Sequence, residues 1–442
     1  MRRRRPSRPP GAENAAAAGP ARLVQIEKPI YGGEFLARED RKALFVPLVL
    51  PGEAARVEIV EDRAKRGYAK AELLELVTQS PERVAPRCPH FGSCGGCHYQ
   101  HAAYEAQLRM KQQILRETLE RGGVKAPDEI AVLAGEPWQY RNRIRVAFDA
   151  EGNAGYRNRR SHQVIPIREC PIAAPVLVET AVAAAEHYKR FALRSRPVEL
   201  SLFCDAGGES ILASVFASAP ARAPLADYLD ALMGACGKVK GVELIEQRGE
   251  HTRAVAQSGA ASLSYRAGNS DYRVNHGAFF QVNRWLIDAL IERVAGNTGG
   301  NLAWDLFAGV GLFARQLSAR FACVVAVESA PAAAGALAAN LEGSAGDASA
   351  MPVLDFLRVN ASGSPPDLIV MDPPRTGLGE EIVSLLGRIA APALKYVSCD
   401  PATLARDLRG LLQGGYIIES IALVDLFPQT FHLESVVHLR RA

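Results

Sequence analysis

The sequence predicts three folded parts: a small N-terminal β-barrel of the OB type, a central α+β domain and a C-terminal doubly wound, Rossmann-like α/β domain. Short alternating strands separated by Gly-Gly and Pro-Gly turns indicate the barrel. Closely spaced cysteines mark the central part, and an apolar strand followed by a Gly-x-Gly turn marks the last. The expected boundaries are 1–20 for a tail, 21–79 for the barrel, 80–274 for the central domain and 275–442 for the C-terminal domain.

The composition indicates a soluble, cytoplasmic protein. With 442 residues the chain can bury a large core without disulfides, and eight cysteines suit a reducing compartment. We expect no membrane span and no signal peptide, because no apolar run is long enough for either. Five arginines lie in the first eight residues and supply the net charge of +4, so residues 1–20 are expected to be a disordered basic arm. A polyanion would therefore bind local basic patches on the folded body.

The barrel is predicted from about five short strands in residues 22–78. OB-type barrels often bind single-stranded nucleic acid. A β-barrel without a ligand is the alternative that the pattern leaves open.

A cysteine set follows the barrel. Cys88, Cys94 and Cys97 form a Cys-x5-Cys-x2-Cys motif, and Cys170 is followed by proline. Four thiolates can hold a 4Fe-4S cluster or zinc, but zinc usually takes two Cys-x2-Cys pairs and this set has one, which favours the cluster. Because the spacing differs from that of radical enzymes, we expect a structural or RNA-positioning role. Three further cysteines are expected to be ordinary buried residues: Cys204, Cys236 and Cys323.

Residues 104–121 show the periodicity of a helix. Two arginine-rich stretches follow it, before Cys170. Residues 140–146 alternate so that three arginines lie on one face, and residues 156–162 resemble a neighbouring hairpin. Arginines interleaved with tyrosines suit phosphate contact and base stacking, although such runs are often solvated surfaces.

The C-terminal domain carries a nucleotide-binding pattern. Residues 302–313 combine an apolar strand, the Gly309-x-Gly311 turn and a helix start, and Glu328 ends the next strand, where an acid can hold a ribose. The pattern also fits nicotinamide binding. Asp305 before the glycines and Asp372, which starts an Asp-Pro-Pro turn, are instead typical of S-adenosylmethionine-dependent methyltransferases.

Cys399 is a candidate nucleophile. It follows the apolar run 394–397 and precedes an amphipathic helix, so amide dipoles are expected to favour its thiolate. Asp400 or Thr403 could cap that helix. The alternative is a buried structural cysteine.

Taken together, these motifs and residues 431–436 resemble the RNA uracil-5-methyltransferases, and the four cysteines resemble the RlmD-like, 23S ribosomal RNA type of that family. The resemblance implies an N-terminal TRAM barrel, an iron-sulfur central domain and a class I methyltransferase domain. It also implies Cys399 as nucleophile and Glu434 as general base. S-adenosylmethionine would be bound by these residues: Gln281, Phe307, Gly309, Gly311, Glu328, Asp347 and Asp372.

The sequence departs from the family at two places. Leu312 stands where the family commonly has Asn, and the segment 340–355 is short and irregular where an acid near the adenine is expected. Asp347 is our first candidate for that acid and Asp355 the second.

The expected function is therefore C5 methylation of a uridine, single-stranded or flipped out, in 23S ribosomal RNA. We expect no membrane and no obligate protein partner. A transfer RNA methyltransferase, or a non-catalytic RNA-binding protein with a cluster, are the alternatives.

Overall fold

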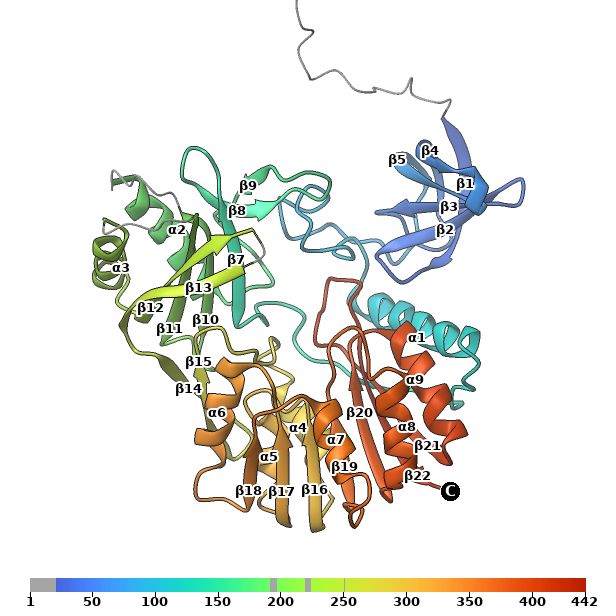
Figure 1. The fold of residues 1–442 in the computed structure, drawn as a ribbon. Coiled ribbons are helices and arrows are strands. Elements are labelled where there is room, and N and C mark those ends of the chain that lie inside the picture. The colour runs from blue at the N-terminus through green and yellow to red at the C-terminus, as the bar shows by residue number, and fades with distance from the viewer. Residues whose placement is uncertain (1–20, 191–196, 219–223, 250) are drawn as a thin grey trace, which may run out of the picture. The chain divides into compact units, whose positions relative to one another are not determined.

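The computed structural model describes residues 21–190, 197–218, 224–249 and 251–442. The chain forms two compact units, of which the first ends at Arg83 and the second runs from Val84 to Ala442 (Figure 1). The predicted disordered arm, residues 1–20, lies outside the described residues.

The first unit is a five-stranded closed barrel with the strand order β1-β2-β3-β5-β4. Apolar residues alternate with exposed ones along the strands, as in β1, where Val24 and Ile26 are buried. The prediction of a small N-terminal barrel is confirmed. The elements of this unit are β1 (Arg22–Pro29), β2 (Glu34–Glu39), β3 (Lys42–Pro47), β4 (Ala54–Arg63), the 3-10 turn η1 (Ala64–Arg66) and β5 (Tyr68–Thr78).

Glu53 links the end of this unit to its loops by hydrogen bonds. Its fully buried carboxylate accepts hydrogen bonds from the backbone of Leu50 (2.7 Å) and Ser80 (3.2 Å) and from the Arg83 guanidinium (2.6 Å). Burial alone would raise the pKa of Glu53, but these hydrogen bonds outweigh it, so the pKa is lowered. The carboxylate therefore stays charged and fixes the segment that leaves the barrel.

The second unit begins with helix α1 (Tyr104–Arg121), which has the bounds that its sequence periodicity predicts. A seven-stranded sheet follows, ordered β13-β12-β11-β10-β7-β8-β9, and helices α2 and α3 pack on one face of it (Figure 1). This sheet and the hairpin β14-β15 comprise β7 (Arg143–Phe148), β8 (Ala154–Arg157), β9 (Val164–Pro166), α2 (Pro175–Arg190), β10 (Pro197–Cys204), β11 (Ile211–Ser218), α3 (Pro224–Ala235), β12 (Val239–Arg248), β13 (His251–Gly259), β14 (Ser262–Ala267) and β15 (Ser270–Asn275).

An eight-stranded sheet forms the C-terminal part, in the order β18-β17-β16-β19-β20-β22-β21-β6. Strands β18 to β20 are parallel to one another, and β22 is antiparallel to both of its neighbours. The elements are β6 (Ala131–Leu133), α4 (Ile287–Ala295), β16 (Gly300–Leu306), α5 (Leu312–Leu317), β17 (Phe321–Val327), α6 (Pro331–Leu341), β18 (Gly346–Ser349), α7 (Val353–Asn360), β19 (Leu368–Met371), α8 (Glu380–Ile389), β20 (Ala393–Ser398), α9 (Pro401–Gln413), β21 (Tyr416–Val424) and β22 (Glu434–Arg441).

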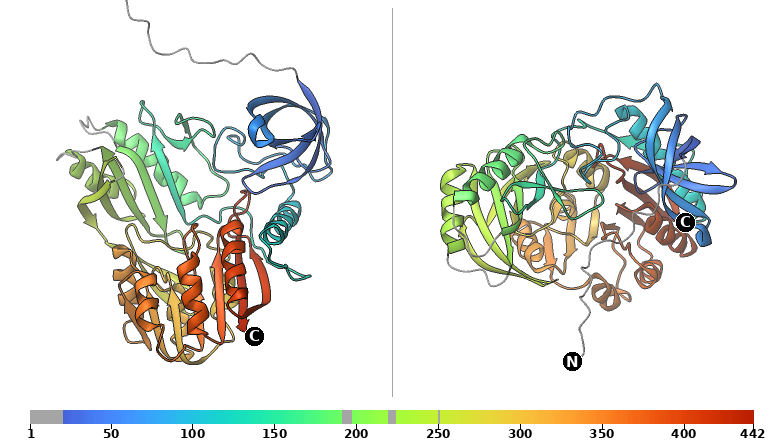
Figure 2. Two further views of the ribbon diagram at one scale, coloured as in Figure 1. Left: turned by 45° about the vertical axis from the view of Figure 1, so that its right-hand side comes forward. Right: turned by 90° about the horizontal axis from the view of Figure 1, so that it is seen from above.

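The strand order reverses between β16 and β19, because the chain runs outward from β16 to β18 and then returns to β19 and β20. Right-handed crossovers therefore put the helices in two rows: α4, α5 and α6 in one, and α7, α8 and α9 in the other. Helix α1 packs beside α9 and extends the second row (Figure 2). Ligands of such sheets bind where the order reverses.

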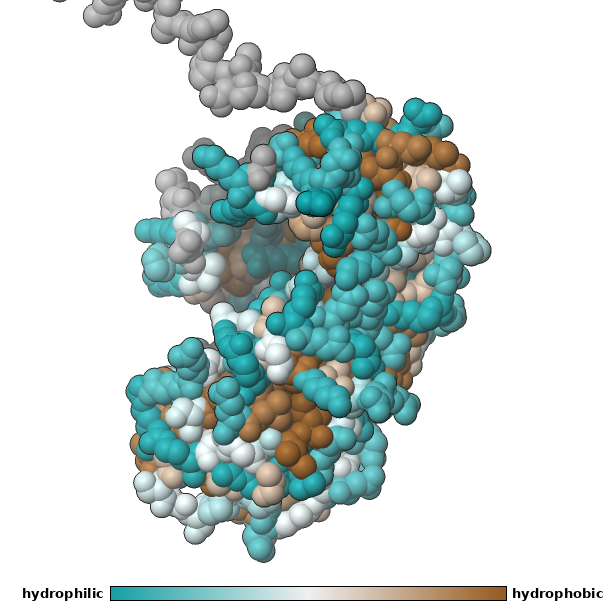
Figure 3. All heavy atoms as spheres, turned by 90° about the vertical axis from the view of Figure 1, so that its right-hand side faces the viewer, coloured by the Kyte–Doolittle hydropathy of each residue, from teal (hydrophilic) through white to brown (hydrophobic). Residues whose placement is uncertain are grey.

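Hydrophilic residues predominate on the face shown in Figure 3, with smaller patches of apolar ones among them. Across the described ranges, the structure contains no helix that is both long and apolar enough to span a membrane.

Candidate functional site

The candidate site lies at the carboxyl ends of four neighbouring parallel strands, β17, β16, β19 and β20 (Figure 1). The residues just beyond those ends are Glu328, Phe307, Asp372 and Cys399, respectively. Strand pairing brings these ends to one edge of the sheet, since Leu306 pairs with Met371 and Met371 with Tyr396. The topology thus gathers the predicted donor-binding and nucleophilic residues at the point where the strand order reverses.

The turn after β16 requires unusual backbone angles. Gly309 has a φ of 57° and Gly311 one of 89°, and Phe307 adopts the left-handed region with a φ of 62°. Such a φ is uncommon outside glycine and costs energy. Glu328 holds the turn through one hydrogen bond, from the Gly309 amide to Oε2 (2.9 Å), while its Oε1 accepts from the Ala330 amide in its own loop (2.7 Å).

Asp305 lies beneath this turn and is fully buried. Its Oδ2 accepts a hydrogen bond from the Ala314 amide (2.8 Å), while Oδ1 has no hydrogen-bond partner among the described residues. Burial, together with the charges of Asp372 and Glu328, raises the pKa of Asp305 to about 8. The sheet edge is therefore short of positive charge.

Asp372 and Gln281 meet at the same edge. The side-chain amide of the buried Gln281 donates to Oδ2 of Asp372 (3.2 Å). The side-chain amide of Asn142 donates to the backbone carbonyl of Gln281 (2.8 Å). Burial raises the pKa of Asp372 to about 7. Gln281 lies 91 residues before Asp372, so the fold brings together two residues that the resemblance alone had paired with the donor.

The two candidates for an acid near the adenine, Asp347 and Asp355, lie apart from the residues at the ends of the four strands. Asp347 is an exposed residue within the edge strand β18, paired in register with Val325, and Asp355 lies exposed on α7, where it pairs with Arg358 (3.3 Å). Leu312 begins α5 and is buried. The assignment of an acid near the adenine stays a prediction.

Cys399 occupies the turn between β20 and α9. Asp400 caps α9 by accepting from the amides of Ala402 (2.9 Å) and Thr403 (3.0 Å), which decides between the two predicted caps. The predicted stabilisation of the thiolate, however, is wrong for the protein alone. Burial raises the pKa of the Cys399 thiol to about 12, and the charges of Glu434 and Asp372 add to this increase. The thiol is therefore protonated at neutral pH.

Glu434 is the first residue of β22, which pairs antiparallel with β20 so that Ser435 lies opposite Ser398. Its side chain is buried, and Oε1 lacks a hydrogen-bond partner in the part of the chain that the structure describes. Burial and the charge of Asp372 raise its pKa well above the usual value, while Arg375 acts in the opposite direction. A buried carboxylate with an unused oxygen is suited to accept a proton.

The loop 425–433, which leads to Glu434, is attached to α1 by a buried ion pair. Lys111 Nζ lies 2.6 Å from Asp425 Oδ1, and both side chains are fully buried. Tyr104 donates to the other carboxylate oxygen (3.0 Å), and Lys111 also donates to the carbonyl of Phe427 (2.9 Å). The sequence analysis missed these residues, because a lysine within a helical pattern gives no signal of a partner 314 residues away.

Gln429 is the second attachment point. It is buried in the left-handed region (φ 67°), and its carbonyl oxygen accepts from the amides of His98 (2.8 Å) and Tyr99 (3.0 Å). Its side chain and backbone bond reciprocally with Gln107 (3.0 Å each). Further along the loop, the His98 ring packs edge-on against Phe431, with centroids 4.7 Å apart. The loop before Glu434 thus contacts the residues that directly follow Cys97.

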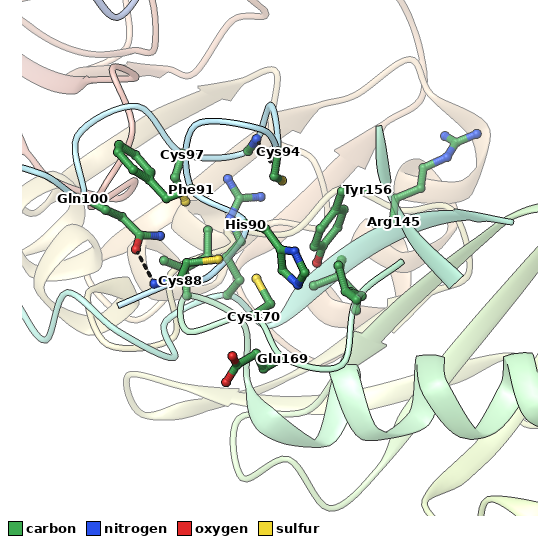
Figure 4. Close-up of a pocket in the computed structure, with 15 residues that line it drawn as sticks. Cys88, His90, Phe91, Cys94, Cys97, Gln100, Arg145, Tyr156, Glu169 and Cys170 are labelled. Carbon is green, nitrogen blue, oxygen red and sulfur yellow. Dashed lines mark hydrogen bonds between the residues drawn. The ribbon is translucent and has the colours of Figure 1, made fainter. Parts of the chain in front are cut away.

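The four predicted metal-ligating cysteines line one cavity of about 270 Å³ (Figure 4). Cys88, Cys94 and Cys97 come from the loop before α1, and Cys170 comes from the segment before α2. The Gln100 side chain accepts from the Cys88 amide (3.0 Å), and the Gly96 amide donates to the sulfur of Cys94 (3.4 Å). The rest of the wall is mixed, with apolar side chains beside charged ones: Phe91, Ile144, Ile167, Ile172, Arg141, Arg145 and Glu169.

Within the described ranges, no group of three or more His, Cys, Asp or Glu side chains is close enough together to hold a metal ion. Burial raises the pKa of the Cys97 thiol to about 12; the charge of Cys170 adds to the shift and that of Arg141 opposes it. The thiols therefore influence one another electrostatically, although they are not close enough together to hold a single metal ion.

Comparisons with known proteins show the family of this chain. A family model described as tRNA (Uracil-5-)-methyltransferase matches residues 365–442. A relative from Chromohalobacter salexigens, the 23S rRNA (uracil(1939)-C(5))-methyltransferase RlmD, is 34% identical over 95% of this chain and 89% of its own length. One from Streptomyces avermitilis, described as an uncharacterized RNA methyltransferase, is 33% identical over 95% of this chain and 98% of its own.

Among solved structures, a tRNA (uracil-54, C5)-methyltransferase from Pyrococcus abyssi, in complex with S-adenosyl-L-homocysteine, matches 95% of this chain and 100% of its own with a TM-score of 0.73. At 24% identity this likeness concerns the fold. The fold and the matches define an RNA methyltransferase. More narrowly, the chain belongs to the RNA uracil-5-methyltransferase family.

We expect Lys111→Met to detach the loop 425–433. Removing one partner of a buried pair leaves an uncompensated charge, which costs about 3–5 kcal/mol. The loop amides should exchange hydrogen faster and the unfolding midpoint should fall, whereas Lys111→Met/Asp425→Leu should recover much of the loss. Arg358→Met, which breaks an exposed pair with Glu381 (2.7 Å), is the control and should change neither measurement. Normal protection of the loop in Lys111→Met would contradict this role.

Proposed function

We propose that this protein transfers a methyl group from S-adenosylmethionine to C5 of a uridine in 23S ribosomal RNA through a covalent Cys399 adduct. The observation that carries the proposal is the position of Cys399 at the end of β20, next to Glu434 at the start of the paired strand β22 and to Asp372 at the end of the paired strand β19. The adjacent Gly-x-Gly turn supplies a site for the donor. One nucleophile, one proton acceptor and one donor site are what C5 methylation of uracil needs.

The donor site is assigned to the class I methyltransferase edge of the sheet. We propose that the Gly309 and Gly311 turn lets the backbone approach the nucleoside and that Glu328, which accepts from the Gly309 amide, also accepts from the ribose hydroxyls. Phe307, Gln281 and Asp372 would bind the methionine part, which the hydrogen bond between Gln281 and Asp372 supports. Asp347 remains our candidate near the adenine.

The raised pKa values suggest an order of events. Asp305, Asp372, Glu434 and the Cys399 thiol all favour their neutral forms because they are buried near one another. A sulfonium cation placed among them favours the charged forms of all four. We infer that the donor binds first and makes the Cys399 thiolate accessible.

The proposed reaction has three covalent steps: addition of the thiolate, methyl transfer and elimination. The Cys399 proton leaves to a neighbouring carboxylate or to water, and the thiolate adds to C6, which pushes the electron pair of the C5–C6 bond into an enolate. C5 of the enolate takes the methyl group, and the sulfonium becomes a neutral thioether. Glu434 removes the C5 proton, the double bond re-forms and the C6–sulfur bond breaks, which releases Cys399. Because these atoms lie within a base stack, the uridine must be unstacked.

Ribosomal rather than transfer RNA is proposed because two relatives that match most of this chain are named as methyltransferases of uracil 1939 of 23S rRNA. A solved structure of similar fold is that of a tRNA (uracil-54, C5)-methyltransferase, so tRNA is the second candidate. We further propose that the N-terminal barrel is a TRAM-type RNA-binding platform.

We also propose that the cysteine-lined cavity holds a 4Fe-4S cluster. Four thiols from two chain segments and an amide donating to sulfur fit such a group, whose charge would offset the cost of four thiolates. Cys88, Cys94, Cys97 and Cys170 would hold it. The cluster would supply a cross-link between the loop before α1 and the segment before α2.

The function is tested with labelled S-adenosylmethionine and unmodified RNA. We expect label at C5 of a uridine in 23S RNA and none in tRNA, read by nuclease digestion and mass spectrometry. A tRNA-only result would select the second candidate. Label in neither RNA, with the donor bound, would refute the proposed activity.

Cys399→Ala and Glu434→Gln should fail at different steps. The alanine variant should form neither adduct nor product, because no thiol remains to attack C6. Glu434→Gln should add and methylate but release the product at least about 100-fold more slowly, since a general base contributes at least that factor. A methylated protein–RNA species should then survive denaturing electrophoresis and be absent from the double variant. Turnover of Glu434→Gln at the wild-type rate would assign the base to another residue.

Protein purified without oxygen should be brown and contain about four iron atoms per chain. Cys97→Ser and Cys170→Ser should lose most of the iron, whereas Cys323→Ser, a cysteine on β17, should retain it. About one zinc and no iron per chain would replace the cluster with a tetrathiolate zinc site.

A further inference from the structure

A second cavity, of about 480 Å³, adjoins the cysteine-lined one and opens to solvent. Glycines of the cysteine loop and residues of β7 and β8 form its walls. We call it the arginine pocket, after the cationic side chains that line it: Arg145, Arg157 and Arg159. In Figure 4 the guanidinium of Arg145 lies on the far side of Tyr156 from the cysteines, so its charge faces away from the cysteine-lined cavity.

Backbone hydrogen bonds build this pocket. The Gly95 amide donates to the carbonyl of Arg157 (3.3 Å), and the Arg159 amide donates to the carbonyl of Ser93 (2.8 Å). A Cβ at Gly95 would come within 3.5 Å of the Arg159 backbone, so the two segments touch closely. The positions of these arginine backbones are therefore fixed by the cysteine loop.

The pocket carries an excess of positive charge. Glu199 on β10 is its one acidic lining residue in the described chain, and it pairs with both Arg145 (2.5 Å) and Arg157 (2.8 Å). Two arginines thus share one carboxylate, while Arg159 adds a third cation. Both paired arginines keep half of their side-chain surface exposed (51%), which leaves their guanidinium groups accessible to an anion.

A short series of rings connects the pocket to the candidate active site. His98 lines the pocket, and its ring packs against Phe431 at 4.7 Å. Phe431 packs in turn against His432 at 4.1 Å, two residues before Glu434. The lining of the pocket is therefore in contact with the loop that leads to Glu434.

We propose that the arginine pocket binds a phosphate, with its nucleotide, of the single-stranded RNA that flanks the target uridine. This inference rests on the proposed function for the identity of the RNA, but not for the presence of the site. The chemistry that the pocket recognises is a phosphodiester beside an unpaired base, since guanidinium forks bind phosphate and an open cavity of this size admits more than the phosphate. The pocket would set which nucleotide next to the target is held.

The test measures binding of the full-length protein to a single-stranded 23S fragment at several salt concentrations. Arg157→Gln and Arg159→Gln should each weaken binding by about threefold to tenfold and reduce the slope of log affinity against log salt by about 0.7. Glu199→Gln should tighten binding, because it removes the carboxylate that competes for the arginines. Arg253→Gln, on the exposed strand β13 at the opposite edge of the same sheet, is the matched control.

Unchanged affinity and salt slope in both arginine variants would overturn the proposal, as would weaker binding in Glu199→Gln or an equal loss in Arg253→Gln. An equal loss of affinity for a fully paired duplex would also overturn it, because the pocket would then contribute only general charge. Circular dichroism and metal content, unchanged from wild type, exclude misfolding of the adjoining cysteine loop. Since binding needs no methyl transfer, a protein that fails the methylation assay can still pass this test.

Discussion

Neither Lys111 nor Asp425 could remain ionised alone in the interior of this protein, because burying a single charge costs several kcal/mol. Together they form a pair at 2.6 Å with further hydrogen bonds from Tyr104 and to Phe427. The pair joins the first helix of the second unit to the loop between its last two strands. The position of Glu434, whose Oε1 has no hydrogen-bond partner in the described chain, depends on this junction.

A second constraint acts at the sheet edge itself. Parallel strands of a doubly wound sheet end together, so the acids that follow them are necessarily neighbours. Burial raises the pKa values of Asp305, Asp372 and the Cys399 thiol, and the charges of neighbouring acids add to the increase for Asp305 and Cys399. A cation bound at such an edge would favour the ionised forms of these buried acids and of the thiol. In a family that transfers methyl groups, a sulfonium donor is a natural source of that charge.

Local sequence patterns predicted much of the fold. The five-stranded barrel, the bounds of α1, and the strand before and the helix after the Gly-x-Gly turn follow from periodicity and turn residues. Patterns could not predict interactions between distant segments, such as the pairing of Gln107 with Gln429. They also suggested the wrong ionisation state for Cys399, because the helix that follows it was visible in the sequence while Glu434 and Asp372 beside it were not.

Strand β6 has only three residues, and it pairs in parallel with β21 at the outer edge of the eight-stranded sheet. This small strand hydrogen-bonds an edge that would otherwise be open to another chain. A strand near residue 131 thus joins a sheet whose other strands lie after residue 299, and helix α1 packs on this same part of the chain. During synthesis on the ribosome, β6 and α1 are therefore expected to remain without their packing partners until the last strands have been made. A fragment that starts at residue 275 would expose the β21 edge and leave Asp425 unpaired.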